Sequence, residues 1–232
     1  MKGSDMDRII LDNIPFEVDE KGFAEILKIK PGSRSAAEFS QILGEARHVA
    51  RPKAAFAVAS VDQLTDESVR IGKVTFKSRI LKVNLEHAGI VYPFVATCGA
   101  EIEDWSKSMN GMLHSFWADN IKMMALGCAL SHLDSYLKER LEGAQLSSMN
   151  PGSLEDWPIE QQAPLFELLA DAAGSIGVSL SRSMVIQPLK SVSGIQFVSE
   201  EGFVNCSLCP REDCPGRRAD YDAGLYDVRY GH

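Results

Sequence analysis

The order of strand-like and helix-like segments along the chain restricts the fold class. Residues 69–97 are rich in β-branched and aromatic side chains with partial alternation, which predicts two or three antiparallel strands. From about Ile102 to Leu141 the apolar residues recur at helical spacing, so a long helical stretch follows directly. Helices and strands are therefore segregated along the sequence and do not alternate, which favours an α+β fold.

Shorter elements are expected on both sides of this centre, and glycine and proline residues separate several of them. They are a strand or turn at 8–18, helices at 20–29 and 33–52, a short strand at 54–59, a loop at 147–158, a helix at 159–177 and two closing strands within 178–199. We expect residues 1–200 to form one α+β domain, followed by a cysteine-containing segment and tail at 201–232.

The charge and hydropathy of the chain argue against nucleic-acid and membrane partners. The 232 residues carry a formal net charge of −8, which disfavours non-specific binding to phosphate backbones. No segment approaches the roughly 20 apolar residues that span a bilayer. The N-terminal region carries Asp5, Asp7 and Asp12 and lacks the apolar run of a secretory signal, so we expect a cytoplasmic protein.

Three of the five cysteines lie close together near the C-terminus, with Cys206, Cys209 and Cys214 in a C-x2-C-x4-C pattern. Two thiolates separated by two residues can bind one metal ion or one cluster from a tight turn. The spacing does not distinguish a [4Fe–4S] cluster from zinc, and a fourth ligand has to come from elsewhere. The alternative is a disulfide or a set of mobile thiols. We favour ligation, because disulfides are rare in the cytosol.

The stretch LFELLADAAGSIGVSLSRSMVIQPLKSVSGIQF, residues 165–197, contains a distinctive order of motifs. A helix of the LFELL type precedes an IG-x-x-L-x-x-S strand, a proline and an SVSG turn that leads into a strand. This order resembles the reactivation domain of cobalamin-dependent methionine synthase. The matching residues are Ile176, Gly177, Leu180, Ser183, Pro188, Ser191, Val192, Ser193 and Gly194.

The resemblance implies an α+β fold with a curved antiparallel sheet flanked by helices. It also implies a stand-alone protein that services a separate corrinoid-binding methyltransferase. In the family, the domain holds S-adenosylmethionine near the corrinoid, and this ligand methylates the cobalt after its reduction. The cofactor-binding residues that the resemblance assigns are Ser148, Asn150, Pro151, Gly152, Ser153, Ser191, Ser193 and Gly194.

The family's S-adenosylmethionine loop, R-x-x-P-G-Y, is only partly retained in this sequence. Pro151 and Gly152 are present, whereas Ser148 stands in place of the arginine and Ser153 in place of the tyrosine. An arginine would meet the ligand carboxylate with a charge-assisted pair of hydrogen bonds, which a serine cannot supply. The resemblance therefore extends to the fold more than to the residues that recognise S-adenosylmethionine.

Other residues have both a structural and a functional interpretation. Cys98 and Cys128 have small or apolar neighbours, so we expect them to be buried structural cysteines. His114 and His132 can share one helix face, and a cobalt ligand is the functional alternative to an ordinary histidine. One apolar group can shape a pocket for a corrin ring, although such residues pack in the core by default. Its members are Trp105, Met109, Met112, Trp117, Met123 and Met124.

Three functional hypotheses follow. The first is an accessory protein for a corrinoid methyltransferase, which supports reductive reactivation of the corrinoid or methyl transfer. The second is a cobalamin-binding or carrier protein that uses the former S-adenosylmethionine cleft. The third is a redox module in which the three cysteines hold an iron–sulfur cluster or zinc. An iron–sulfur cluster is the preferred form, because it can carry electrons to cobalt, and the first and third hypotheses are compatible.

Overall fold

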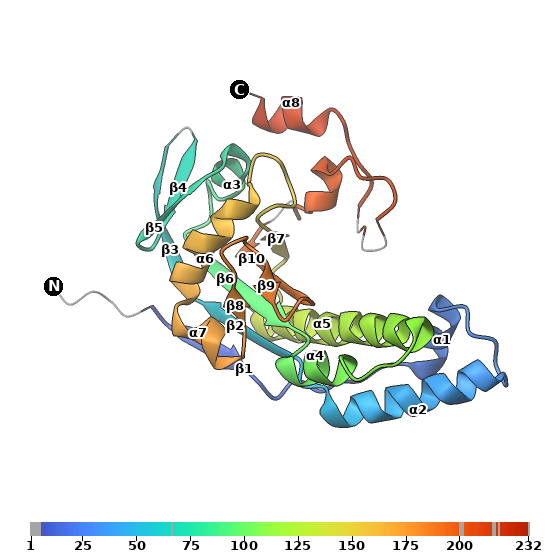
Figure 1. Cartoon of the computed structure of the whole chain (residues 1–232). Coiled ribbons are helices and arrows are strands. Elements are labelled where there is room, and N and C mark those ends of the chain that lie inside the picture. Colours follow the sequence, from blue (N-terminus) through green and yellow to red (C-terminus); the bar gives the residue numbers. More distant parts are fainter. Residues whose placement is uncertain (1–5, 66, 200–201, 215–216, 218, 232) are drawn as a thin grey trace.

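An antiparallel sheet organises the computed structural model, which describes residues 6–65, 67–199, 202–214, 217 and 219–231. The fold is α+β, and helices cover both faces of the sheet (Figure 1), as the sequence predicts. The strands are β1 (Arg8–Leu11), β2 (Lys53–Ala57), β3 (Ala59–Leu64), β4 (Ser68–Ile71), β5 (Val74–Lys77), β6 (Ile90–Thr97), β7 (Leu146–Met149), β8 (Ser179–Leu180), β9 (Ile186–Gln187) and β10 (Ser191–Val198). The helices are α1 (Glu20–Ile26), α2 (Arg34–Val49), α3 (Arg79–Asn84), α4 (Ala100–Ser106), α5 (Met112–Arg140), η1 (Ile159–Gln161), α6 (Gln162–Leu169), α7 (Asp171–Ser175), η2 (Asn205–Leu208) and α8 (Leu225–Tyr230).

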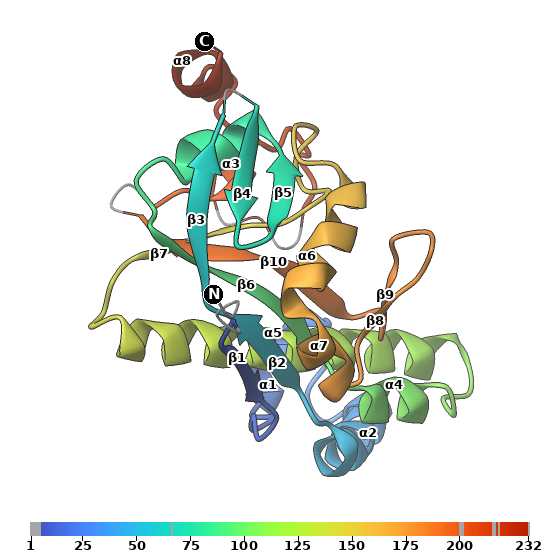
Figure 2. The same ribbon diagram turned by 90° about the vertical axis from the view of Figure 1, so that its left-hand side faces the viewer.

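Strand β6 is the centre of the sheet, because it pairs with other strands along both of its edges. β10 follows one edge, with Phe197 opposite Val91 and Ser191 opposite Thr97, and β7 pairs with the outer edge of β10. The second edge of β6 is shared between β2 and β3. The sheet therefore divides beyond β6, with β1 next to β2 in one direction and β4 and β5 next to β3 in the other (Figure 2).

Alternation along the central strands explains why helices cover both faces of the sheet. Phe56 and Phe94 belong to an apolar cluster on the side where α2, α4 and α5 pack. Their neighbours Ala55 and Val95 belong to a cluster on the opposite side, against α6 and α7. A third cluster around Trp157 includes residues of β4, β5, α3 and β10. A strand that is buried on both faces is expected to be continuously apolar, as β6 nearly is.

The single helical stretch expected over residues 102–141 is wrong, because the structure has two helices there, α4 and α5. The hydroxyl groups of Ser106 and Ser108 donate hydrogen bonds to the carbonyl oxygens of Glu103 and Trp105, each at 2.7 Å. Such bonds compete with continuation of a helix. Gly111 then adopts a φ of 84°, which most residues avoid, and α5 begins at the next residue.

Two other segments also differ from expectation. Two or three strands are predicted within 69–97, and three are present, but α3 lies between β5 and β6. Ser78 caps α3 by accepting a hydrogen bond from the Leu81 amide at 2.9 Å. The helix expected over 159–177 is divided into η1, α6 and α7. Ala170, with a φ of 45°, separates α6 from α7. In both segments a local turn interrupts a pattern that looked continuous.

The C-terminal segment packs back onto the rest of the protein. Val204 forms a parallel bridge with Ser148 on the outer edge of β7. Phe203 and Tyr230 are buried and meet edge to face, with ring centroids 6.5 Å apart. The Tyr230 hydroxyl donates a hydrogen bond to the Asn84 Oδ1 atom at 3.0 Å. The described residues after 202 therefore contact both β7 and α3.

The longest helix, α5, has 29 residues and carries charged residues along its length. Within the described ranges, no helix combines the length and the apolar character needed to cross a bilayer.

Candidate functional site

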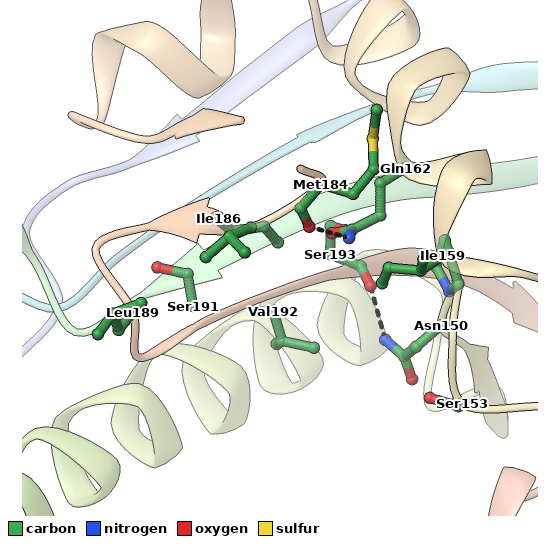
Figure 3. A pocket seen from close by; sticks show the side chains of 12 residues that line it. Asn150, Ser153, Ile159, Gln162, Met184, Ile186, Leu189, Ser191, Val192 and Ser193 are labelled. Carbon is green, nitrogen blue, oxygen red and sulfur yellow. Dashed lines mark hydrogen bonds between the residues drawn. The ribbon is translucent and has the colours of Figure 1, made fainter. Parts of the chain in front are cut away.

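The loop after β7 and the first half of β10 lie against each other. β7 pairs with the second half of β10, which brings the chain after Met149 alongside the first half. The Asn150 Nδ2 group donates a hydrogen bond to the Ser193 carbonyl oxygen at 2.9 Å (Figure 3). The Pro-Gly loop and the SVSG motif, both singled out in the sequence, therefore meet at one place.

Gly194 permits this close contact. A Cβ atom at this position would lie 2.4 Å from the Met149 carbonyl oxygen and 2.5 Å from Asn150 Nδ2. Carbon atoms do not approach oxygen or nitrogen atoms so closely without displacing them, and the Met149 oxygen belongs to the backbone of a paired strand. The last residue of the SVSG motif is therefore a glycine because the loop rests directly on the β10 backbone.

A pocket of about 250 Å³ opens beside this contact (Figure 3). Five predicted cofactor-binding residues line it, namely Asn150, Pro151, Ser153, Ser191 and Ser193. The other described lining residues come from η1, α6, the β8–β9 hairpin and β10; they are Ile159, Gln162, Met184, Val185, Ile186, Leu189 and Val192. Among all these described residues no side chain is charged, so the pocket is polar but neutral.

The three remaining predicted residues are close to the pocket and are not among its described lining residues. Ser148 belongs to β7, where it pairs with Gln196 of β10. Gly152 donates its backbone N–H to the Trp157 carbonyl oxygen at 2.7 Å and shapes the loop. Gly194 acts through the close contact described above. Cofactor binding by these residues stays a prediction.

Gln162 is a pocket residue that the sequence interpretation missed. Its side chain is only 4% exposed. The Oε1 atom accepts a hydrogen bond from the Ser193 hydroxyl at 3.1 Å, and Nε2 donates one to the Met184 carbonyl oxygen at 2.9 Å (Figure 3). It stands one helical turn before Leu165 and two turns before Leu169, which are both buried, so its position on the apolar face of α6 was the available signal.

The loop that carries Asn150 and Ser153 is anchored at its far end by Trp157. This side chain is fully buried and meets Phe76 edge to face, with ring centroids 6.1 Å apart. The neighbouring Asp156 carboxylate accepts hydrogen bonds from the Ser78 hydroxyl and from the backbone N–H of Ile80, the latter at 3.0 Å. The loop is therefore fastened to both the core and the start of α3.

The cysteine segment lies beside the same loop. Asn205 directly precedes Cys206 in the chain. Its Nδ2 group donates a hydrogen bond to Asn150 Oδ1 at 3.4 Å. The Arg217 guanidinium donates hydrogen bonds to the carbonyl oxygens of Cys206 at 3.2 Å and Cys209 at 3.0 Å. The backbone of the cysteine segment is thus folded around the Arg217 guanidinium, next to the loop that lines the pocket.

Cys206, Cys209 and Cys214 are half-buried thiols, and none of them is assigned to a disulfide. Within the part of the chain that the structure describes, no three His, Cys, Asp or Glu side chains converge closely enough to hold a metal ion. Ligation of a cluster or zinc by these three cysteines therefore stays a prediction.

The apolar group proposed for a corrin pocket does not gather in one place. Trp117 is buried in the core and stacks on His114, with ring centroids 5.5 Å apart. Met112, by contrast, is 91% exposed, and Phe116 and Met123 are about half exposed. These three side chains recur at helical spacing and form an apolar stripe along α5.

The apolar stripe of α5 adjoins the turn between β9 and β10. Asp119 lies on the same helix face, and its Oδ2 atom forms an ion pair with Lys190 Nζ at 2.9 Å. The neighbouring Leu189 is exposed and lines the pocket. The stripe (Met112, Phe116 and Met123) and the pocket rim therefore belong to adjoining surfaces.

The two other cysteines differ in burial. Cys98 is fully buried, as expected, and Cys128 is half-buried, with its thiol donating to the Glu17 carbonyl oxygen at 3.5 Å. Burial raises the pKa of the Cys98 thiol to about 12, and the nearby Glu103 carboxylate adds to this effect. Burial also raises the pKa of Cys128. The expected burial is therefore confirmed for Cys98 and is wrong for Cys128, which is only half-buried.

We expect Cys98 to resist alkylation by iodoacetamide in the folded protein at mildly alkaline pH, because only the thiolate reacts. Folding raises the pKa of the Cys98 thiol from its ordinary value of 9.0 to about 12. The free energy of unfolding therefore keeps the full contribution of the neutral thiol below pH 9, and this contribution is lost as the pH rises towards about 12. Peptide mapping by mass spectrometry should find Cys98 labelled only in denaturant. Labelling of native Cys98 at the rate measured in denaturant would contradict this account.

Comparison with known proteins identifies the fold. No protein-family model matches this sequence, and no curated protein matches it significantly. The structure is similar to the solved structure of the MetH reactivation domain bound to AdoHcy, with a TM-score of 0.57 and 13% sequence identity. The similarity covers 86% of this chain and 80% of that chain. The α+β fold that the sequence resemblance predicts is thereby confirmed as the fold of the MetH reactivation domain.

Proposed function

We propose that this protein is an accessory protein of a corrinoid methyltransferase, which docks on the corrinoid-binding protein and supports reductive reactivation or methyl transfer. The observation that carries the proposal is the meeting of the Pro-Gly loop and β10 at one pocket, in a chain whose fold is that of the MetH reactivation domain. The adjoining apolar stripe of α5 offers a surface for a protein partner, since exposed apolar side chains in a row are typical of interaction sites.

The residues at the pocket do not fit S-adenosylmethionine bound in the family's manner. That ligand carries a carboxylate, an ammonium and a sulfonium group, and the described lining of the pocket is neutral. Ser148, in place of the family's arginine, is not among the described lining residues. An uncompensated charge is costly to bury, so we assign no step to this ligand.

The proposal predicts measurable binding to a purified corrinoid-binding protein of the same organism. Calorimetry should detect binding, and the visible spectrum should report faster return of inactive cobalt(II) corrinoid to the methylated state when a low-potential reductant and a methyl donor are present. Phe116→Asp and Met123→Asp should each weaken binding by about tenfold, because a carboxylate is placed in an apolar contact. Ile26→Asp, on exposed α1, is the matched control. Absence of binding to every corrinoid-binding partner would refute the proposal.

A metal-dependent redox role is a second candidate, and one observation favours it. Asn205 contacts the pocket loop through Asn150, so the cysteine segment is beside the proposed site. Cys206, Cys209 and Cys214 would be the ligands, and an iron–sulfur cluster would supply one-electron transfer. Anaerobic purification followed by metal analysis should find stoichiometric iron, which Cys206→Ser should reduce strongly. A protein with neither iron nor zinc would exclude this candidate.

A further inference from the structure

We propose that the neutral pocket receives a carboxamide side chain of a corrinoid and discriminates against carboxylates. This inference rests on the proposed function and names the part of the ligand that the site reads. The volume of the pocket is about 250 Å³. Pockets that enclose a whole small molecule are usually about 300–1,000 Å³. The pocket is therefore suited to a group that projects from a larger ligand.

The hydrogen-bonding groups of the pocket complement a primary amide. Each amide nitrogen of Asn150 and Gln162 carries two N–H groups, and one is used by the bonds to the Ser193 and Met184 carbonyl oxygens. A second N–H on each side chain can donate to a ligand carbonyl oxygen. The hydroxyl groups of Ser153 and Ser193 can accept from a ligand NH2 group. A carboxamide offers both partners, whereas a carboxylate offers acceptors alone.

The electrostatics of the pocket favour the same ligand. No described lining side chain is charged, and the nearby Lys190 ammonium is engaged by Asp119. A carboxylate entering the pocket would lose part of its hydration without gaining a cation. The apolar side chains at the rim, including Ile159, Val185 and Leu189, are exposed and would contact the flat apolar macrocycle that carries the amide. The periphery of a corrin has this combination of an apolar ring and carboxamide arms.

The network of amides also holds the pocket in a defined shape. It begins with the hydrogen bond from Asn205 to Asn150. It continues from Asn150 to the Ser193 backbone, and from the Ser193 hydroxyl through Gln162 to the Met184 backbone (Figure 3). Five separate segments are joined in this way, so the donors are positioned before the ligand arrives. Preorganised donors lose little conformational freedom on binding.

The test is a titration of the full-length protein with two free corrinoids, followed by calorimetry and by visible absorbance. Dicyanocobinamide has carboxamide side chains, and dicyanocobyrinic acid has carboxylates in their place. We expect the carboxamide form to bind about tenfold more tightly, because the acid brings an uncompensated charge. Ser153→Arg, at an exposed rim position, should reduce or reverse this preference by binding the acid more tightly. Ile26→Arg, on exposed α1, should leave the preference unchanged.

The outcomes separate this inference from the proposed function. Equal affinity for the two corrinoids, no binding of either one, or a preference unaffected by Ser153→Arg would each overturn the inference. Tight binding of S-adenosylmethionine would also overturn it, because that ligand brings charges that the pocket does not match. A preserved amide preference with no docking to any corrinoid-binding protein would support the inference and refute the accessory role.

Discussion

Replacement of Trp157 with alanine should lower the free energy of unfolding by about 3–5 kcal/mol, the range for truncating a large buried aromatic side chain. The indole is fully buried against Phe76, and its position holds the carbonyl oxygen that accepts the Gly152 N–H. Urea denaturation followed by far-UV circular dichroism measures the change. The Pro-Gly loop should also lose protection in amide hydrogen exchange, because its anchor is removed.

Trp157→Phe is the matched control for this prediction. In the described structure, the Trp157 Nε1 atom is buried without a hydrogen-bond partner, so a phenyl ring removes little polar stabilisation. The phenylalanine variant should therefore lose clearly less stability than the alanine variant. An alanine variant that is destabilised by less than about 1 kcal/mol would show that the indole does not fasten the loop.

Gly194→Ala should destabilise the protein by about 1–3 kcal/mol, the range for overpacking a well-packed site. The added carbon atom would meet the Met149 carbonyl oxygen and Asn150 Nδ2, so the loop has to move away from β10. The change should be measured as a free energy of unfolding, together with the affinity for dicyanocobinamide. We expect both to fall, because the pocket is built on this contact.

Gly44→Ala provides the opposite control. Gly44 lies inside α2, and nothing lies within 4 Å of a Cβ atom built there. Alanine in a helix interior is more stable than glycine by about 0.5–1 kcal/mol, so this variant should be slightly more stable than the wild type. If Gly194→Ala behaved like Gly44→Ala, the close approach of the loop to β10 would not be rigid.

Much of the fold was predictable from the sequence because the apolar pattern and the capping residues act locally. Ser33 caps α2 at the start of the helix expected over 33–52, and the segment containing β6 was recognised as strand. The break between α4 and α5 was missed, although Ser108 and Gly111 are typical turn residues. Apolar residues recur at helical spacing both before and after this short segment, so the turn residues Ser108 and Gly111 were not taken as the end of a helix.

Less of the candidate site could be predicted, since its geometry depends on contacts between distant segments. The resemblance assigned Ser148 to ligand binding, but this residue pairs within β7 and is not among the described lining residues of the pocket. Gln162 was missed because a glutamine near the start of a helix is usually exposed. The proximity of Asn205 to Asn150 follows from the way the C-terminal segment returns to β7, which no local pattern encodes.

The bridge between Val204 and Ser148 covers part of the outer side of β7. Among the described strands, β7 is the last at its end of the sheet, and an open outer strand is a template on which other molecules can add strands. Phe203 and Tyr230 secure the covering segment by their burial. The residues that place the cysteine segment beside the pocket loop therefore also cover part of the edge at which other molecules could add a strand. We expect loss of this segment to increase aggregation.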